Sequence, residues 1–145
     1  MFVDETQIRV RYAETDQMNV VYYGNYAQYL EVARAELIRS LGFTYKDMES
    51  MGVIMPVVEL HMKFVQPARY DDLLIIRTIL HQMPADHRIE FHHEIYNENH
   101  RLVAKGRVIL FFMDMKTMAK SRMPRELEMR LEKYFSPRTN PASAM

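Results

Sequence analysis

The chain has 145 residues, which suits a single domain, and 48% of them are hydrophobic while 26% are charged. Its 19 basic and 19 acidic side chains give a net charge of zero, which argues against a broad attraction to nucleic acid or to an anionic membrane surface. The absence of cysteine excludes disulfides, thiolate nucleophiles and Cys-ligated zinc.

The N-terminal segment carries Asp4 and Glu5 where a signal peptide needs an apolar run. No stretch of the sequence approaches the roughly 20 apolar residues of a membrane span. We therefore expect a soluble, cytoplasmic protein with no membrane partner.

The first part of the chain predicts one strand and one long helix. Residues 7–12 alternate between apolar and polar side chains, as in a half-buried strand. Apolar residues then recur every three or four positions, which describes one face of a helix of about five turns. Gly42 follows the helix as a C-terminal cap, and residues 44–51 fit one further helical turn. The apolar helix positions are Tyr26, Tyr29, Leu30, Ala33, Leu37, Ile38 and Leu41.

The rest of the chain predicts four strands and a last helix. The strands cover residues 53–65, interrupted by Pro56, and residues 73–80, 88–96 and 102–113. An amphipathic helix is expected from about Pro124 to Phe135. We predict one domain over residues 1–135, followed by a small, polar and frayed tail over residues 136–145.

The order of these elements favours an α+β fold. Four sequential strands with short connections favour an antiparallel sheet, and the only long helix must bury its apolar face on that sheet. A strongly curved five-stranded sheet around one central helix meets both requirements. Since long apolar edge strands invite pairing, we expect a homodimer whose sheets join edge to edge, with a tetramer as a further possibility.

Asp16 stands in the loop between the first strand and the long helix. Unpaired N–H groups at a helix start favour a developing oxyanion, and a neighbouring carboxylate can activate water or attack a carbonyl. Asp is also common in turns and caps, although Asn25 with Gln28 is the better capping pair. Spacing alone leaves both interpretations of Asp16 open.

Residues 12–36, YAETDQMNVVYYGNYAQYLEVARAE, closely resemble the active-site motif of the hot-dog-fold acyl-CoA thioesterases, in the branch of 4-hydroxybenzoyl-CoA thioesterase. The resemblance covers residues 5–135 and includes the turn at 66–69 with Asp71-Asp72-Leu73. The matching motif positions are Glu14-Thr15-Asp16, Val21-Tyr22, Asn25-Tyr26, Glu31 and Ala33-Arg34.

The resemblance implies a hot-dog fold with Asp16 as the catalytic carboxylate, acting as general base or nucleophile. It implies the backbone N–H of Tyr23 as the donor to the thioester carbonyl, and a helix that begins nearer Tyr22. The substrate would be an acyl-CoA or acyl-carrier-protein thioester bound along a subunit interface. Coenzyme A would be part of the substrate, with no other cofactor. Asn19 stands where the family has a loop glycine, and asparagine is the non-glycine residue that best tolerates positive φ.

Other side chains have two interpretations each. Tyr22 and Tyr26 line an acyl pocket or belong to the core, and Lys120 and Arg122 contact coenzyme A phosphates or are solvated. The carboxylate of Glu31 is predicted to be structural.

The remaining polar candidates are expected to be ordinary strand residues. Glu59 is predicted to lie on a solvated strand face. The adjacent His92 and His93 should point to opposite faces of a strand, and the histidines show no metal-ligand spacing.

Two other function classes stay open. A hot-dog hydratase or dehydratase typically needs a histidine with a carboxylate, yet no histidine lies between Met1 and Leu60. A non-catalytic acyl-thioester binding protein is disfavoured by Asp16 beside a helix start.

Overall fold

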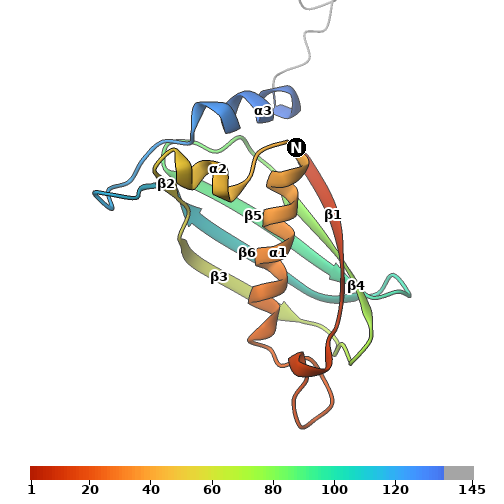
Figure 1. Cartoon of the computed structure of the whole chain (residues 1–145). Helices are drawn as coiled ribbons and strands as arrows, with labels where there is room; N and C mark the ends of the chain where they lie inside the picture. The colour runs from red at the N-terminus through yellow and green to blue at the C-terminus, as the bar shows by residue number, and fades with distance from the viewer. Residues whose placement is uncertain (136–145) are drawn as a thin grey trace, which may run out of the picture.

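The computed structural model describes residues 1–135 and shows a curved sheet wrapped around one long helix (Figure 1). The helices are the 3-10 turn η1 (Tyr12–Glu14), α1 (Asn25–Ser40), α2 (Tyr45–Ser50) and α3 (Arg125–Phe135). The strands are β1 (Phe2–Arg9), β2 (Val53–Ile54), β3 (Val57–Phe64), β4 (Leu73–Leu80), β5 (Arg88–Tyr96), β6 (Leu102–Phe111) and β7 (Met113–Asp114).

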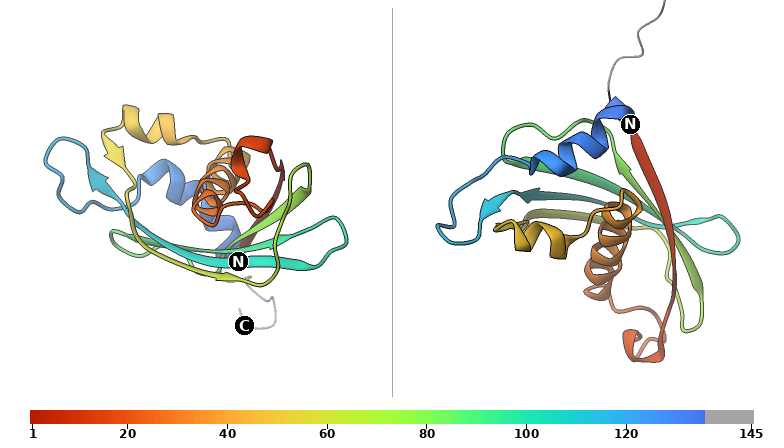
Figure 2. Two further views of the ribbon diagram at one scale, coloured as in Figure 1. Left: turned by 90° about the horizontal axis from the view of Figure 1, so that it is seen from below. Right: turned by 45° about the horizontal axis from the view of Figure 1, so that its top comes forward.

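The main sheet has five strands in the order β1-β4-β5-β6-β3, and every neighbouring pair is antiparallel. Figure 2 shows the sheet curving beneath α1, which lies across its concave face. The predicted α+β architecture of a curved five-stranded sheet, one central helix and a short last helix is therefore confirmed.

The core fills the space between α1 and the sheet. All seven apolar helix positions predicted from the sequence are buried. They meet the inward row of the sheet, in which Leu74, Ile76, Phe91 and Ile95 have no exposed surface. The helix ends as predicted, since Gly42 adopts φ 77° and donates a hydrogen bond to the carbonyl of Arg39 at 2.9 Å.

The first strand lies earlier in the chain than residues 7–12, where alternation predicted it. Tyr12 belongs to η1 and is 78% exposed. The strand extends to Phe2 because the ring of Phe2 packs on Tyr134, with 4.3 Å between ring centroids. The amino group of Met1 also donates a hydrogen bond to the Tyr134 carbonyl at 3.0 Å. No local pattern can show a contact between the two ends of the chain.

Pro56 divides the predicted strand of residues 53–65 into β2 and β3, because proline has no N–H for a ladder. The short β2 instead pairs with β7 in a separate two-stranded sheet. The predicted turn at residues 44–51 is α2, which Thr44 and Asp47 cap reciprocally.

The connection between β3 and β4 crosses the fold. The short connections between sequential strands in the sequence did not predict this path. β3 is an edge strand beside β6, whereas β4 lies between β1 and β5. Residues 65–72 make the crossing. The N–H of Val21 donates to the carbonyl of Ala68 at 2.8 Å, and the N–H of Asp71 donates to that of Val10 at 3.0 Å. The crossing thus holds the loop that carries Asp16.

The C-terminal helix packs against β1, and its Leu127 and Leu131 are buried. The predicted tail of residues 136–145 lies outside the described residues. Within residues 1–135, no helix is long and apolar enough to cross a bilayer.

Candidate active site

A closed loop joins η1 to α1 and carries Asp16. Thr15 and Val21 form an isolated antiparallel bridge across it, and the N–H of Asp16 donates to the carbonyl of Val20 at 2.9 Å. The N–H of Asn19 donates to the carbonyl of Asp16 at 3.0 Å, and Asn19 adopts φ 62°. The expected positive φ at this position is confirmed.

A buried carboxylate, Glu14, anchors both ends of this loop. Its Oε1 accepts hydrogen bonds from the N–H of Arg11 at 2.7 Å and the hydroxyl of Tyr29 at 2.9 Å. Its main-chain oxygen accepts from the N–H of Tyr22 at 3.0 Å and Nδ2 of Asn25 at 2.8 Å. Burial acts to raise the pKa of Glu14, but the hydrogen bonds from Arg11 and Tyr29 outweigh it and hold the pKa below its usual value.

The N-terminus of α1 is not capped by the residues that the sequence predicted. α1 begins at Asn25, with Gly24 as N-cap and no side-chain cap. The predicted pair of Asn25 and Gln28 is wrong, because the Asn25 amide bonds to Glu14 instead. Helical turns nevertheless begin at Tyr22, whose carbonyl accepts from the N–H of Asn25 at 2.9 Å.

An apolar cavity of about 340 Å³ opens beside Asp16 and the start of α1. The carboxylate accepts one hydrogen bond, from the N–H of Met18 at 2.8 Å, and forms no ion pair within residues 1–135. The N–H of Tyr23 finds no acceptor in the same described part of the chain. A carboxylate and an available donor therefore border one apolar space. Its other walls include Val21, Tyr26, Phe64 and Val65.

The structure separates the remaining predicted binding residues. Tyr26 lines the Asp16 cavity, whereas Tyr22 is 46% exposed and packs at a tilt against Tyr23 outside the lining. Lys120 and Arg122 follow β7, in a segment level with the C-terminal end of α1, while the Asp16 loop lies at its N-terminal end (Figure 1). One chain does not bring them to the same cavity.

A second cavity, of about 460 Å³, lies between α1, α2 and the start of β3. It is bordered by Glu31, Arg34, Tyr45 and Val57. Arg34 is only 5% exposed, and its Nε has no hydrogen-bond partner among the described residues. Burial lowers the pKa of this guanidinium, against the opposing effects of Tyr45 and Glu31. The sequence marked Arg34 only as a motif position, although an arginine four residues after Leu30 falls on the buried helix face.

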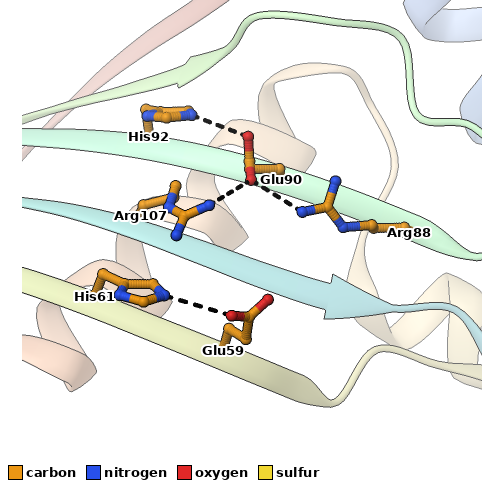
Figure 3. Close-up of polar contacts among 6 residues, drawn as sticks. All are labelled: Glu59, His61, Arg88, Glu90, His92 and Arg107. Carbon is orange, nitrogen blue, oxygen red and sulfur yellow. Dashed lines mark hydrogen bonds and ion pairs between the residues drawn. The ribbon is translucent and has the colours of Figure 1, made fainter.

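The face of the sheet away from α1 carries a cluster of charges (Figure 3). Glu90 contacts Arg88, Arg107 and His92, each at 3.2 Å. Glu59 lies on the same face, is exposed as predicted, and is 3.5 Å from the Nε2 of His61. Because these side chains are on the outer face, they do not reach the Asp16 cavity.

His93 points to the opposite face from His92, as alternation predicted. Its Nδ1 lies 3.0 Å from the hydroxyl of Thr78 in the core. Burial, with smaller effects of Arg34 and His92, lowers the pKa of His93 from 6.5 to about 3. The ring is therefore neutral at physiological pH.

The sequence matches the pattern of the thioesterase-like superfamily over residues 10–131. The chain belongs to this superfamily. The Bacillus subtilis protein YneP, whose name as an acyl-CoA thioesterase is provisional, is 40% identical over 106 residues, covering 73% of this chain and 76% of YneP. The acyl-CoA thioester hydrolase YbgC of Escherichia coli is 28% identical, covering 83% of this chain and 89% of YbgC.

Solved structures of the superfamily share the fold. A DHNA-CoA thioesterase from Staphylococcus aureus is 36% identical and superposes with a TM-score of 0.81, covering 93% of this chain and 85% of that one. The prediction of a hot-dog fold within an acyl-CoA thioesterase family is therefore confirmed.

Proposed function

We propose that this chain hydrolyses acyl-CoA thioesters, with Asp16 as the catalytic carboxylate. The observation that carries the proposal is the cavity that Asp16 shares with the N–H of Tyr23, which finds no acceptor within residues 1–135. Thioesterase-like relatives named for acyl-CoA hydrolysis support the reaction class.

The chemistry needs one base and one oxyanion donor. The thioester carbonyl accepts a hydrogen bond from the N–H of Tyr23, at the positive end of the α1 dipole. Asp16 takes a proton from water as that water attacks the carbonyl carbon. The C–S bond then breaks, the sulfur leaves with the proton held by Asp16, and a carboxylic acid remains. In the covalent alternative Asp16 attacks the carbonyl carbon, and the C–S bond breaks to release the thiolate. Water then hydrolyses the resulting anhydride, which frees the carboxylic acid and restores Asp16, and the thiolate takes up a proton from that water.

The proposed substrate contacts of the other candidate binding residues follow from where these residues lie in the fold. Tyr26 lines the acyl space next to Asp16. Tyr22 is exposed beside Tyr23, outside the cavity lining, and is proposed to contact the substrate there. Lys120 and Arg122 are proposed to meet coenzyme A phosphates only across a subunit boundary, because the segment after β7 and the loop before α1 lie at opposite ends of α1 within one chain. We also propose the homodimer expected from the sequence, with a tetramer as its further assembly.

The test is thiol release from a panel of acyl-CoA thioesters by wild type and Asp16→Asn. The substitution keeps the shape of the side chain and removes its charge, so turnover should fall by about 10²-fold or more. Asp86→Asn is the matched control, because Asp86 is exposed in a turn at φ 54° and outside the cavity.

Equal turnover by wild type and Asp16→Asn would show that Asp16 is not the catalyst. Hydration of an enoyl thioester would instead assign a hydratase. Tight binding without turnover of either coenzyme A or carrier-protein thioesters would assign a binding protein.

A further inference from the structure

The second cavity, which we call the Arg34 cavity, is separate from the Asp16 cavity within one chain. The two cavities share no lining residue. On α1, Tyr26 borders the Asp16 cavity and Arg34 borders the other, about 12 Å further along the helix axis. The Arg34 cavity has a volume of about 460 Å³, which suits a small organic molecule.

Most of the wall of the Arg34 cavity is apolar. Its apolar side chains come from α2, β2, β6 and the segment between β2 and β3. Such a wall keeps water away from a polar group, so an electrostatic contact inside the cavity is stronger than the same contact at the surface. These side chains include Met48, Val53, Ile54, Met55 and Leu110.

Arg34 is the only cation among the described residues that line this cavity. Its guanidinium donates a hydrogen bond to the hydroxyl of Tyr45, whereas its fully buried Nε has no hydrogen-bond partner within residues 1–135. In that part of the chain it also forms no ion pair with a carboxylate. A buried cation is stable when an anion or several acceptors replace its lost hydration. The side chains around Arg34 replace only part of it, which leaves a place for the anion of a ligand.

Glu31 and Glu49 also line the cavity, and both are exposed. Glu31 acts on Arg34 electrostatically without forming an ion pair. Water and salt screen an exposed charge, whereas an anion in contact with a buried guanidinium forms charge-assisted hydrogen bonds in a space of low dielectric constant. The attraction to Arg34 therefore outweighs the repulsion from the two exposed carboxylates.

We propose that the Arg34 cavity binds a small organic carboxylate. Its carboxylate group accepts hydrogen bonds from the guanidinium, because the two planar groups match in geometry. Its apolar body, aromatic or short aliphatic, packs against Met48 and Met55. This site is additional to the proposed hydrolysis, since it contains neither Asp16 nor a group that reacts with a thioester. The acid that the proposed reaction releases belongs to the same chemical class.

Methionine methyl groups report on the two cavities separately. Met48 and Met55 line the Arg34 cavity, whereas Met18 lines the Asp16 cavity. In a nuclear magnetic resonance titration of the full chain with benzoate, the methyl signals of Met48 and Met55 should shift and that of Met18 should stay. Benzamide has nearly the same shape without the charge, so it should bind about tenfold more weakly or worse.

Isothermal titration calorimetry of variants tests the role of charge. Arg34→Met removes the cation at a similar volume, and an apolar side chain in place of a buried ion often leaves a fold equally stable. Benzoate affinity should fall by about tenfold or more in this variant, while benzamide affinity changes little. If Arg34→Met does not fold, the comparison of benzoate with benzamide on the wild-type chain still decides.

A matched pair of variants on α1 tests the repulsion. Glu31→Gln removes a carboxylate that acts on Arg34 and should tighten benzoate binding about two- to fivefold. Glu36→Gln removes a carboxylate that pairs with Arg39 outside the cavity, so benzoate affinity should stay at the wild-type value.

Three results would overturn the proposal. Equal affinity for benzoate and benzamide would show that the cavity does not recognise charge. A shift of the Met18 signal alone would place the carboxylate in the Asp16 cavity. No binding of either compound would show that water alone satisfies the guanidinium.

The readout is binding of a free acid, so it is independent of thiol release. Thiol release by a chain that has no benzoate site would overturn this proposal and spare the proposed function. A benzoate site in a chain that releases no thiol would do the reverse.

Discussion

Two carboxylates two positions apart have different environments. Glu14 is buried and receives hydrogen bonds from Tyr29 and the main chain, whereas Asp16 borders the cavity with one local hydrogen bond. The Glu14-Thr15-Asp16 triplet thus divides into an anchor and the proposed reactive group. The hydrogen bonds around Glu14 determine where Asp16 stands.

Removing the Tyr29 hydroxyl should weaken this anchor. In Tyr29→Phe the Glu14 carboxylate loses a donor 2.9 Å away, and we expect kcat to fall about tenfold because the Asp16 loop shifts. KM should change less, since the cavity wall keeps its apolar ring. Steady-state kinetics give both constants. Tyr96→Phe, on the outer face of β5, is the control, and an unchanged kcat in Tyr29→Phe would contradict the positioning role.

His93 should make stability fall in mild acid. The unfolded ring protonates near pH 6.5, whereas the native ring stays neutral down to about pH 3. Between these values the unfolded state binds more protons, so lowering the pH from 6.5 to 4.5 should reduce the free energy of unfolding by about 2 kcal/mol through this group. Denaturant unfolding of wild type and His93→Gln at several pH values measures this change in the free energy of unfolding. A pH-independent difference between the two proteins would contradict the assignment.

At the scale of elements, α1 approaches β6 closely at Gly106. A Cβ atom there would stand 2.6 Å from Sδ of Met62 and 3.0 Å from Cδ1 of Leu30. Glycine at this inward position lets the helix lie against the sheet, and so fixes the distance between the helix and the strands that line both cavities.

Gly106→Val should therefore destabilise the fold by about 1–3 kcal/mol through overpacking. Lys105→Val places the same side chain on the outer face of the same strand, where surface changes typically stay within about 0.5 kcal/mol. Urea unfolding of the two variants compares them. Equal losses of stability in the two variants would show that α1 can shift to accommodate the added side chain.

At the scale of the molecule, the thioester is proposed to bind along the subunit interface of the homodimer. Specific activity should then fall on dilution, in step with dissociation measured by sedimentation, because a monomer lacks the interface along which the thioester is proposed to bind. Activity that stays constant through dissociation would show that one chain holds a complete site.

Sequence patterns determined much of this architecture. The period of the apolar residues from Tyr26 to Leu41 identified the central helix and its buried face, because a helix must cover its apolar stripe. Alternation identified the strands and separated His92 from His93. The motif around Asp16 identified the family, and the open edges of a five-stranded sheet suggested pairing.

The tertiary structure decided the features that depend on contacts distant in sequence. Phe2 joins the first strand because Tyr134 packs on it, and the 65–72 crossing places β3 at the edge. The side-chain amide of Asn25 donates a hydrogen bond to the main-chain carbonyl of Glu14 and does not form the expected helix cap with Gln28. The reason is that a buried carbonyl needs a hydrogen-bond donor. The Nε of Arg34, which has no hydrogen-bond partner within residues 1–135, became visible only once α2 and β2 enclosed it. Local periods specify which face each element buries, whereas the partners of polar groups depend on how the elements pack.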